Sequence, residues 1–354
     1  MFSGGAVIMG QKGLFITAAI IVGSLFSAAG VPAGWLFGAL LAGIFTGLFI
    51  KRFTFEGWPF QAALALVGVN IGFLMDTELF AVLPAYIMPL IVTLSITLMM
   101  GLVFGMLMYR WTNLDVKTAF FCCVPGGASE VISVSRDYGA DDRIVAAFHT
   151  ARITFFVFLI PLSAAVFYPE AASGGTPVDT GVWNPFIGFP MLLCIVALVI
   201  ILNKYVKIPG GALLYALIFG FIIGNWVVPG FAPPGYAAGA GQALIGAMVG
   251  IRFDRETLLR VKSIGLPSLG ILQFFLLLSL LLAGLFTLMT PLPYITSLLS
   301  TVPAGAAEMS STAFALQLEP TLVSALHIIR VIVLFLLLPF LVKWIDRMIL
   351  KNEG

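Results

Sequence analysis

The sequence predicts an all-α polytopic membrane protein with about 10 transmembrane helices and two re-entrant hairpins, arranged as two inverted five-helix repeats. Three observations support this fold class. Of the 354 residues, 60% are hydrophobic and 10% are charged. Apolar runs long enough to cross a hydrocarbon core about 30 Å thick recur along the whole chain. The rarest residues of the first half recur at a fixed spacing in the second half.

Composition also excludes several classes of function. No long stretch is polar enough for a separate soluble domain, and a net charge of +2 without a basic tract argues against nucleic-acid binding. The first apolar run, 13–30, resembles a cleavable signal peptide, but a duplicate of it inside the chain favours a retained helix. Cys122, Cys123 and Cys194 lack metal-binding spacing, so we interpret them as small apolar side chains and expect no cofactor and no metal.

The duplication is clearest in one short motif. "VPGGASE" at 124–130 is matched by "VPAGAAE" at 302–308, an offset of 178 residues. The same offset pairs the two histidines of the chain with each other and also pairs Asp76 with Asp254, Glu78 with Glu256, Thr118 with Thr296, Ser133 with Ser311, Arg152 with Arg330 and Pro161 with Pro339. Near the start of each half the offset is 177, pairing Pro32 with Pro209, Gly34 with Gly211, Gly43 with Gly220 and Gly47 with Gly224. We predict repeats at 1–175 and 180–354 that form one intertwined unit.

Each repeat contains five apolar segments that we expect to be helices. In the first repeat they lie near 13–30, 33–50, 58–75, 80–109 and 143–168. In the second repeat they lie near 185–203, 211–228, 236–252, 264–290 and 320–345. The PGG or PAG motif falls between the fourth and fifth segment of each repeat.

Loop charges predict the topology, because short cytoplasmic loops collect Lys and Arg. In the first repeat, bases follow the second segment (Lys51, Arg52) and the fourth segment (Arg110, Lys117). In the second repeat they follow the first segment (Lys204, Lys207), the third segment (Arg252, Arg255, Arg260, Lys262) and the fifth segment (Lys343, Arg347, Lys351). The connection 169–184 has Glu170 and Asp179 and no base. The repeats are therefore inverted, which requires the PGG and PAG regions to return to the side they entered. We expect a multi-pass membrane protein with both termini in the cytoplasm.

The hairpin tips supply the polar chemistry. We expect Pro125 to end the inbound arm, and Gly126 and Gly127 to provide left-handed dihedrals for a tight turn. Arms of roughly 11 to 13 residues reach the middle of the bilayer. The outbound helix then presents free N–H groups that suit an anion or a carboxylate, with Glu130 in its first turn. Ser133 and Ser311 follow the glutamates by three residues, on the same helical face.

The fifth helix of each repeat adds a histidine and an arginine one turn apart. Ionisable groups at membrane depth mark substrate or ion pathways. The predicted substrate and ion site comprises Pro125, Gly126, Gly127, Ser129, Glu130, Ser133, His149, Arg152, Pro303, Gly305, Glu308, Ser311, His327 and Arg330. An alternative is that Glu130 with Arg152, and Glu308 with Arg330, are structural ion pairs. A second is that both histidines are neutral, buried hydrogen-bonding groups.

Other polar residues carry less specific signals. The counterpart of Asn70 in the second repeat is the apolar Met248. A role of Asn70 in helix packing therefore explains its presence as well as a role in ligand binding does. Asp76, Glu78, Arg252, Asp254 and Glu256 are expected to be interfacial caps and topology anchors. The sequence contains no nucleophile paired with a base, no metal cluster and no phosphate-binding loop, so we do not expect an enzyme.

The repeated patterns "VPGGASEV…GADDRIVAAFHTARI" and "VPAGAAEM…LEPTLVSALHIIRV" resemble the AbrB family of bacterial integral membrane proteins, across both halves. The second copy departs from the first by Ala304 in place of Gly126. The resemblance implies the labels that members carry, regulator of gene expression or ammonia monooxygenase, although the residues support neither DNA contact nor copper chemistry. It also implies that the protein lies in the inner membrane of a bacterial cell. The architecture is similar to that of bacterial sodium/citrate and glutamate symporters, by analogy only.

These observations favour a secondary transporter of a small anionic or zwitterionic solute, coupled to H⁺ or Na⁺ by alternating access. The alternative is a membrane-embedded sensor or regulator of gene expression acting through a partner, for which short loops such as 252–263 are the available surface. The expected partners are the solute, the coupling ion and the lipid bilayer, with no nucleic acid. A homodimer is compatible with the sequence, which does not define the oligomeric state.

Overall fold

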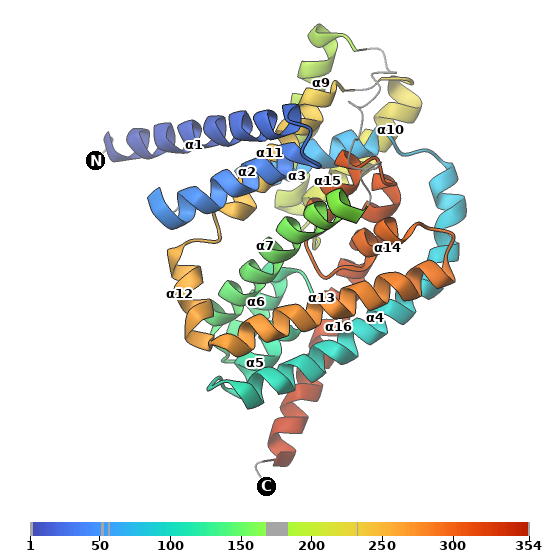
Figure 1. Cartoon of the computed structure of the whole chain (residues 1–354). Helices are drawn as coiled ribbons and strands as arrows, with labels where there is room; N and C mark the ends of the chain where they lie inside the picture. Colours follow the sequence, from blue (N-terminus) through green and yellow to red (C-terminus); the bar gives the residue numbers. More distant parts are fainter. Residues whose placement is uncertain (1–2, 51–52, 56, 168–182, 232, 353–354) are drawn as a thin grey trace. The chain divides into compact units, whose positions relative to one another are not determined.

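The structure is a computed structural model that describes residues 3–50, 53–55, 57–167, 183–231 and 233–352. Within these ranges the chain forms helices and turns and no strand, as the fold class predicts (Figure 1). Lys51, Arg52, Glu170 and Asp179, on which part of the topology prediction rests, lie outside the described residues. Side chains beyond Lys343 in the last helix, including Arg347 and Lys351, are likewise not described.

The helices of the first half of the chain are α1 (Ser3–Ala28), α2 (Gly34–Phe45), η1 (Thr46–Ile50), α3 (Trp58–Gly72), α4 (Glu78–Trp111), α5 (Val116–Cys123), α6 (Ala128–Asp137) and α7 (Asp142–Phe167). Those of the second half are α9 (Pro185–Tyr205), α10 (Gly211–Ile222), η2 (Ile223–Val227), α11 (Gly235–Gly250), α12 (Arg255–Ile264), α13 (Leu266–Met289), α14 (Tyr294–Thr301), α15 (Ala306–Ala315) and α16 (Pro320–Asn352).

Within the described residues, each apolar segment predicted to be helical overlaps a helix of the structure. In the described residues, six helical stretches are long and apolar enough to cross a membrane: Met9–Ala28, Glu78–Trp111, Asp142–Ser163, Pro185–Tyr205, Leu266–Met289 and Pro320–Lys343. The stretches Gly34–Ile50, Trp58–Gly72 and Gly211–Val227 are apolar but shorter. The predicted total of about ten crossings remains a prediction.

The chain divides into two compact units, and each contains segments from both halves of the sequence. Unit 1 comprises Met1–Leu79, Val157–Arg255 and Ala307–Thr321. Unit 2 comprises Phe80–Phe156, Glu256–Ala306 and Leu322–Gly354. We describe each unit by itself.

Unit 1 is built on two equivalent helix pairs, α2 with α11 and α3 with α10. Glycines let the backbones of each pair approach closely, because no Cβ stands between them. In the first pair, a Cβ on Gly43 would lie 2.6 Å from the carbonyl oxygen of Ala247. In the second pair, a Cβ on Gly220 would lie 2.7 Å from the carbonyl oxygen of Val69. The duplication seen in the sequence is therefore also a duplication of helix contacts.

The breaks in these helices are duplicated as well. The residue before α2 is Ala33, with φ 50°, and the residue before α10 is Gly210, with φ 68°. Both α2 and α10 end in five-residue π-helical segments, η1 and η2, at equivalent positions. Such segments interrupt the regular hydrogen-bond ladder and frequently occur at functional sites.

Unit 2 contains the long helices α4 and α13 and the short helices α5, α6 and α14. α4 carries two glycines at its contact with the α5 region: a Cβ on Gly101 would lie 2.8 Å from Pro125, and a Cβ on Gly105 would lie 2.7 Å from the Phe120 ring. The Phe104 and Phe275 rings meet edge to face at 4.9 Å. This packing places the Val124–Gly127 break against α4.

One surface element differs from the expectation of short loops. The segment within 252–263 forms the amphipathic helix α12, which has Arg255, Arg260 and Lys262 and exposes Leu258 and Leu259. Arg260 forms an ion pair of 2.6 Å with Glu256 one turn earlier. Helical spacing of the apolar residues over this basic segment explains why it is ordered as a helix.

Candidate functional site

The region around the PGG motif is a helical hairpin. Asp115 caps α5 by accepting a hydrogen bond of 2.9 Å from the Thr118 N–H. The Thr118 hydroxyl in turn accepts a 2.8 Å hydrogen bond from the Asp141 N–H, just beyond α6. Lys117 donates to the Tyr138 carbonyl at 3.3 Å. The start of α5 is therefore tied to the end of α6, and the chain reverses at Val124–Gly127 between them.

The prediction of left-handed glycines at the PGG turn is wrong. Gly126, Gly127 and Gly305 do not have positive φ, and Gly127 is extended with φ −64° and ψ 126°. Instead, the glycines leave room for the side chains of the first turn of α6. A Cβ on Gly127 would collide with the Glu130 carboxylate, and one on Gly126 would lie 2.7 Å from a methyl group of Val131. Pro125 and Pro303 are buried within the two breaks and leave no N–H to satisfy there.

The two histidines make equivalent hydrogen bonds. His149 Nε2 lies 2.9 Å from the Phe121 carbonyl oxygen, and His327 Nε2 lies 2.6 Å from the Leu299 carbonyl oxygen. A carbonyl oxygen only accepts, so Nε2 carries the proton in both rings. Nδ1 then accepts from an arginine Nη2, at 3.0 Å from Arg152 and 2.6 Å from Arg330. Both imidazoles are thus neutral, and each links a hairpin to the following long helix.

The two arginines are not equivalent. Arg330 donates from Nη1 to the carbonyls of Thr301 at 3.1 Å and Val302 at 2.7 Å, and from Nη2 to Ala304 at 3.2 Å. Arg152 is 2% exposed, and its Nε and Nη1 have no hydrogen-bond partner among the described residues. Its guanidinium carbon lies 5.3 Å from the centre of the Phe275 ring. Both terminal nitrogens of Arg330 are hydrogen-bonded to the protein, whereas Arg152 keeps unused donors.

The glutamates and serines of the two motifs also differ in environment. In α6, Ser129 and Ser133 are exposed and Glu130 is half-buried. In α15, Glu308 is 6% exposed and Ser311 is fully buried. Glu130 and Arg152, both in unit 2, form no ion pair in the described part of the chain, in contrast to the structural pairing considered above. Within unit 1, the cation that acts on Glu308 electrostatically is Arg252.

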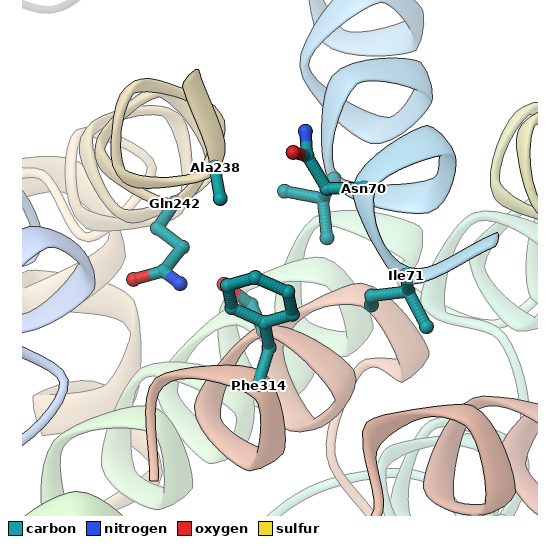
Figure 2. Close-up of a pocket in the computed structure, with 7 residues that line it drawn as sticks. Asn70, Ile71, Ala238, Gln242 and Phe314 are labelled. Atoms are coloured by element: carbon teal, nitrogen blue, oxygen red, sulfur yellow. The ribbon is translucent and has the colours of Figure 1, made fainter. Parts of the chain in front are cut away.

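Unit 1 contains a small, mainly apolar pocket between α3, α11 and α15, with three polar side chains in its lining (Figure 2). It is lined by Val67, Asn70, Ile71, Ala238, Gln242, Ser311 and Phe314. Its empty space is about 160 Å³, and this conformation leaves essentially no room for a water-sized sphere. Figure 2 shows Asn70 and Gln242 on different helices, with the Phe314 ring beside the Gln242 amide and below Asn70. The pocket is closed in this conformation.

The polar groups of this pocket are only partly used. Asn70 donates from Nδ2 to the Leu66 carbonyl at 2.6 Å, which leaves its Oδ1 as an acceptor. The Ser311 hydroxyl and that of neighbouring Ser310 have no partner among the described residues. Buried polar groups are normally paired, so the free Asn70 acceptor and the unpaired Ser311 hydroxyl, which line the same pocket from different helices, indicate a place for a ligand group.

Sequence reasoning missed Gln242 and Phe314. Gln242 is the one polar side chain other than Tyr236 in the small apolar helix Gly235–Gly250, and a lone amide in such a helix is a signal that could have been used. Phe314 carries no local signal, because it looks like any apolar helix residue. Asp76, predicted as a cap, does accept from the Leu79 N–H at 3.1 Å at the start of α4. In the described residues no three His, Cys, Asp or Glu side chains gather as metal ligands.

The fold and these sites define a helical protein with several membrane-length apolar helices and a duplicated helix–break–helix element. The chain belongs to the AbrB family, whose model, described as "Transition state regulatory protein AbrB", matches residues 35–346. It is 25% identical over 352 residues to "Putative regulator AbrB" of Escherichia coli (strain K12), covering 97% of this chain and 99% of that protein. It is 24% identical over 352 residues to "Uncharacterized protein YhjN" of Bacillus subtilis (strain 168), covering 92% and 90%. No solved structure matches the chain.

Proposed function

We propose that this protein is a secondary transporter that moves a small anionic or zwitterionic solute by alternating access, coupled to H⁺ or Na⁺. The observation that carries the proposal is the unequal environment of two sequence-related elements. Ser311 of α15 is buried and lines the pocket of unit 1, whereas its counterpart Ser133 in α6 of unit 2 is exposed. Transporters built from repeats adopt conformations in which the two copies differ, and exchanging their environments gives the opposite state.

The duplicated architecture supports the same proposal. Two five-helix repeats with opposite orientation, at 1–175 and 180–354, would place α5–α6 and α14–α15 as re-entrant hairpins entering from opposite sides. Non-helical backbone at membrane depth is tolerated where it lines a cavity or is buried in protein. The termini would lie in the cytoplasm of a bacterium, and no chemical step is assigned to the protein.

The transport proposal is tested by reconstituting the purified chain in proteoliposomes. Currents on solid-supported membranes would be recorded after jumps of carboxylates and amino acids, with inward Na⁺ or H⁺ gradients. We expect solute-dependent currents that Glu130→Ala and Arg152→Ala abolish. The matched controls are Glu78→Ala and Arg110→Ala, which alter exposed residues of α4 and should leave the solute-dependent currents unchanged. Unchanged currents in both site variants would contradict the assignment of these two residues to the site. The absence of any solute-dependent current in the wild type would contradict the transport proposal.

A regulatory role is the second candidate, and it rests on the printed name of the Escherichia coli relative. A membrane regulator needs a surface for a cytosolic partner. The basic helix α12 is the described element that fits this need, with exposed leucines beside its arginines. Capture of a defined cytosolic protein that is lost when Arg255–Ile264 is replaced by an uncharged helix would favour this role over transport.

A further inference from the structure

Arg152 and Arg330 occupy equivalent positions in the sequence but have different hydrogen-bond environments within unit 2. Arg330 caps the end of α14, because the last carbonyls of a helix have no partner within it. Its Nη1 reaches Thr301 and Val302, and its Nη2 reaches Ala304 and His327. Both terminal nitrogens of this guanidinium are therefore fully engaged by the protein.

Arg152 has one hydrogen bond, from Nη2 to His149. A guanidinium carries one N–H on Nε and two on Nη1, and these three donors have no partner among the described residues. The side chain is 2% exposed. No carboxylate of unit 2 forms an ion pair with it in the described residues. The Phe275 ring lies 5.3 Å from the guanidinium carbon, an arrangement that partly compensates a buried cation and leaves the N–H groups of Nε and Nη1 without a hydrogen-bond partner among the described residues.

Among the described residues of unit 2, the positive charge of Arg152 has no carboxylate partner. His149 is neutral in its hydrogen-bonded form, so it adds no balancing charge. A buried cation with unpaired donors lowers the stability of a protein, and such strain is retained where it serves binding. The planar fork of an arginine matches an anion with two coplanar oxygens.

We propose that Arg152 binds the carboxylate of the transported solute, whereas Arg330 is a structural cap of the second helix break. This inference rests on the proposed transport function and names its substrate class: the solute carries a carboxylate, and only the first repeat supplies the arginine that recognises it. The duplicated motif is thus divided between binding and structure.

The first test needs no ligand and compares Arg152→Met with Arg330→Met. Thermal unfolding of the purified proteins is followed in detergent and chloride buffer. Arg152→Met should melt at the same temperature as the wild type or a few degrees higher, because it removes a buried charge at the cost of a single hydrogen bond, the one to His149 Nδ1. Arg330→Met should melt several degrees lower or fail to fold, because three carbonyls and His327 lose their donor. A drop for Arg152→Met as large as that for Arg330→Met would overturn the proposal.

The second test measures binding. Sodium acetate, sodium succinate and sodium phosphate are added at equal sodium concentration and ionic strength against sodium chloride. At least one carboxylate should raise the melting temperature of the wild type. The same salt should leave Arg152→Met unchanged and stabilise Arg152→Lys less than the wild type. The assignment would be contradicted if no carboxylate raised the melting temperature of the wild type, or if the same salt raised that of Arg152→Met equally. It would also be contradicted if phosphate alone raised the melting temperature.

These outcomes separate this inference from the transport proposal. If carboxylates bind in a manner that depends on Arg152 but no solute flux is found, the anion site stands and the transport proposal is rejected. Flux of a solute in Arg152→Met liposomes at the wild-type rate would retain transport and reject the site. Water molecules that satisfy the three donors would make the melting temperature insensitive to carboxylates, which counts against the proposal.

Discussion

At the residue scale, identical side chains in the two repeats have different roles because their neighbours differ. The histidines keep the same role in both copies, since each donates to a carbonyl 28 residues earlier and accepts from the next arginine. The arginines do not, because carbonyls of the second break approach Arg330 and no equivalent acceptor approaches Arg152. A hydrogen-bonded imidazole with both nitrogens occupied is not available as a proton carrier in this conformation.

The histidine arrangement predicts a spectroscopic result. The chain contains two histidines, so a sample labelled with ¹⁵N-histidine gives two rings. At pH 7 both should show the nitrogen shifts of a neutral ring protonated at Nε2. His149→Gln removes one set of signals and assigns the other to His327. A ring protonated at Nδ1, or doubly protonated at this pH, would show that the described network is not the resting state.

At the element scale, glycine positions determine how the helices of unit 1 pack. Gly72 faces the Leu217 carbonyl, where a Cβ would lie 2.5 Å away, and Gly250 faces the Leu40 carbonyl at the equivalent place in the other pair. A side chain at either position would push two backbones apart. The same residue type plays a different part at Gly126 and Gly127, where it makes room for the first turn of α6 rather than for another helix.

Alanine at these glycines gives a matched prediction. Gly72→Ala and Gly250→Ala should each lower stability by about 1–3 kcal/mol, the usual cost of overpacking. Gly270→Ala in α13 is the control, because a Cβ there meets nothing within 4 Å. It should be neutral or stabilising by up to about 1 kcal/mol, since alanine favours helix over glycine. Thermal unfolding in detergent compares the three, and equal melting temperatures would refute the packing argument.

At the scale of the whole molecule, the units cut across the halves of the sequence. The outbound helix α15 belongs to unit 1, while its counterpart α6 belongs to unit 2. Hydropathy and spacing predicted the helices and the duplication, but not this division, because it depends on contacts between segments far apart in the chain. The prediction of how the repeats are oriented in the membrane still rests on the loop charges.

The topology prediction can be checked by cysteine labelling. The three native cysteines are first replaced, and Asn113→Cys or Arg143→Cys is then introduced at exposed positions on either side of the α5–α6 hairpin. Both should react with an impermeant maleimide from the cytoplasmic side, as a re-entrant hairpin requires. Pro291→Cys, between α13 and α14, should react from the opposite side. Labelling of residues 113 and 143 from different sides would mean that the hairpin crosses the membrane.

The sequence alone determined the class of protein, the helices, the duplication and the family, because hydropathy and the spacing of rare residues are local properties of the chain. It also identified the histidines and arginines of the two motifs. Only the tertiary structure decided that Arg152 keeps free donors, that the PGG glycines provide space instead of left-handed turns, and that Gln242 lines a pocket with Asn70. Those properties depend on which backbone groups and side chains approach a residue from distant segments, and packing sets that approach.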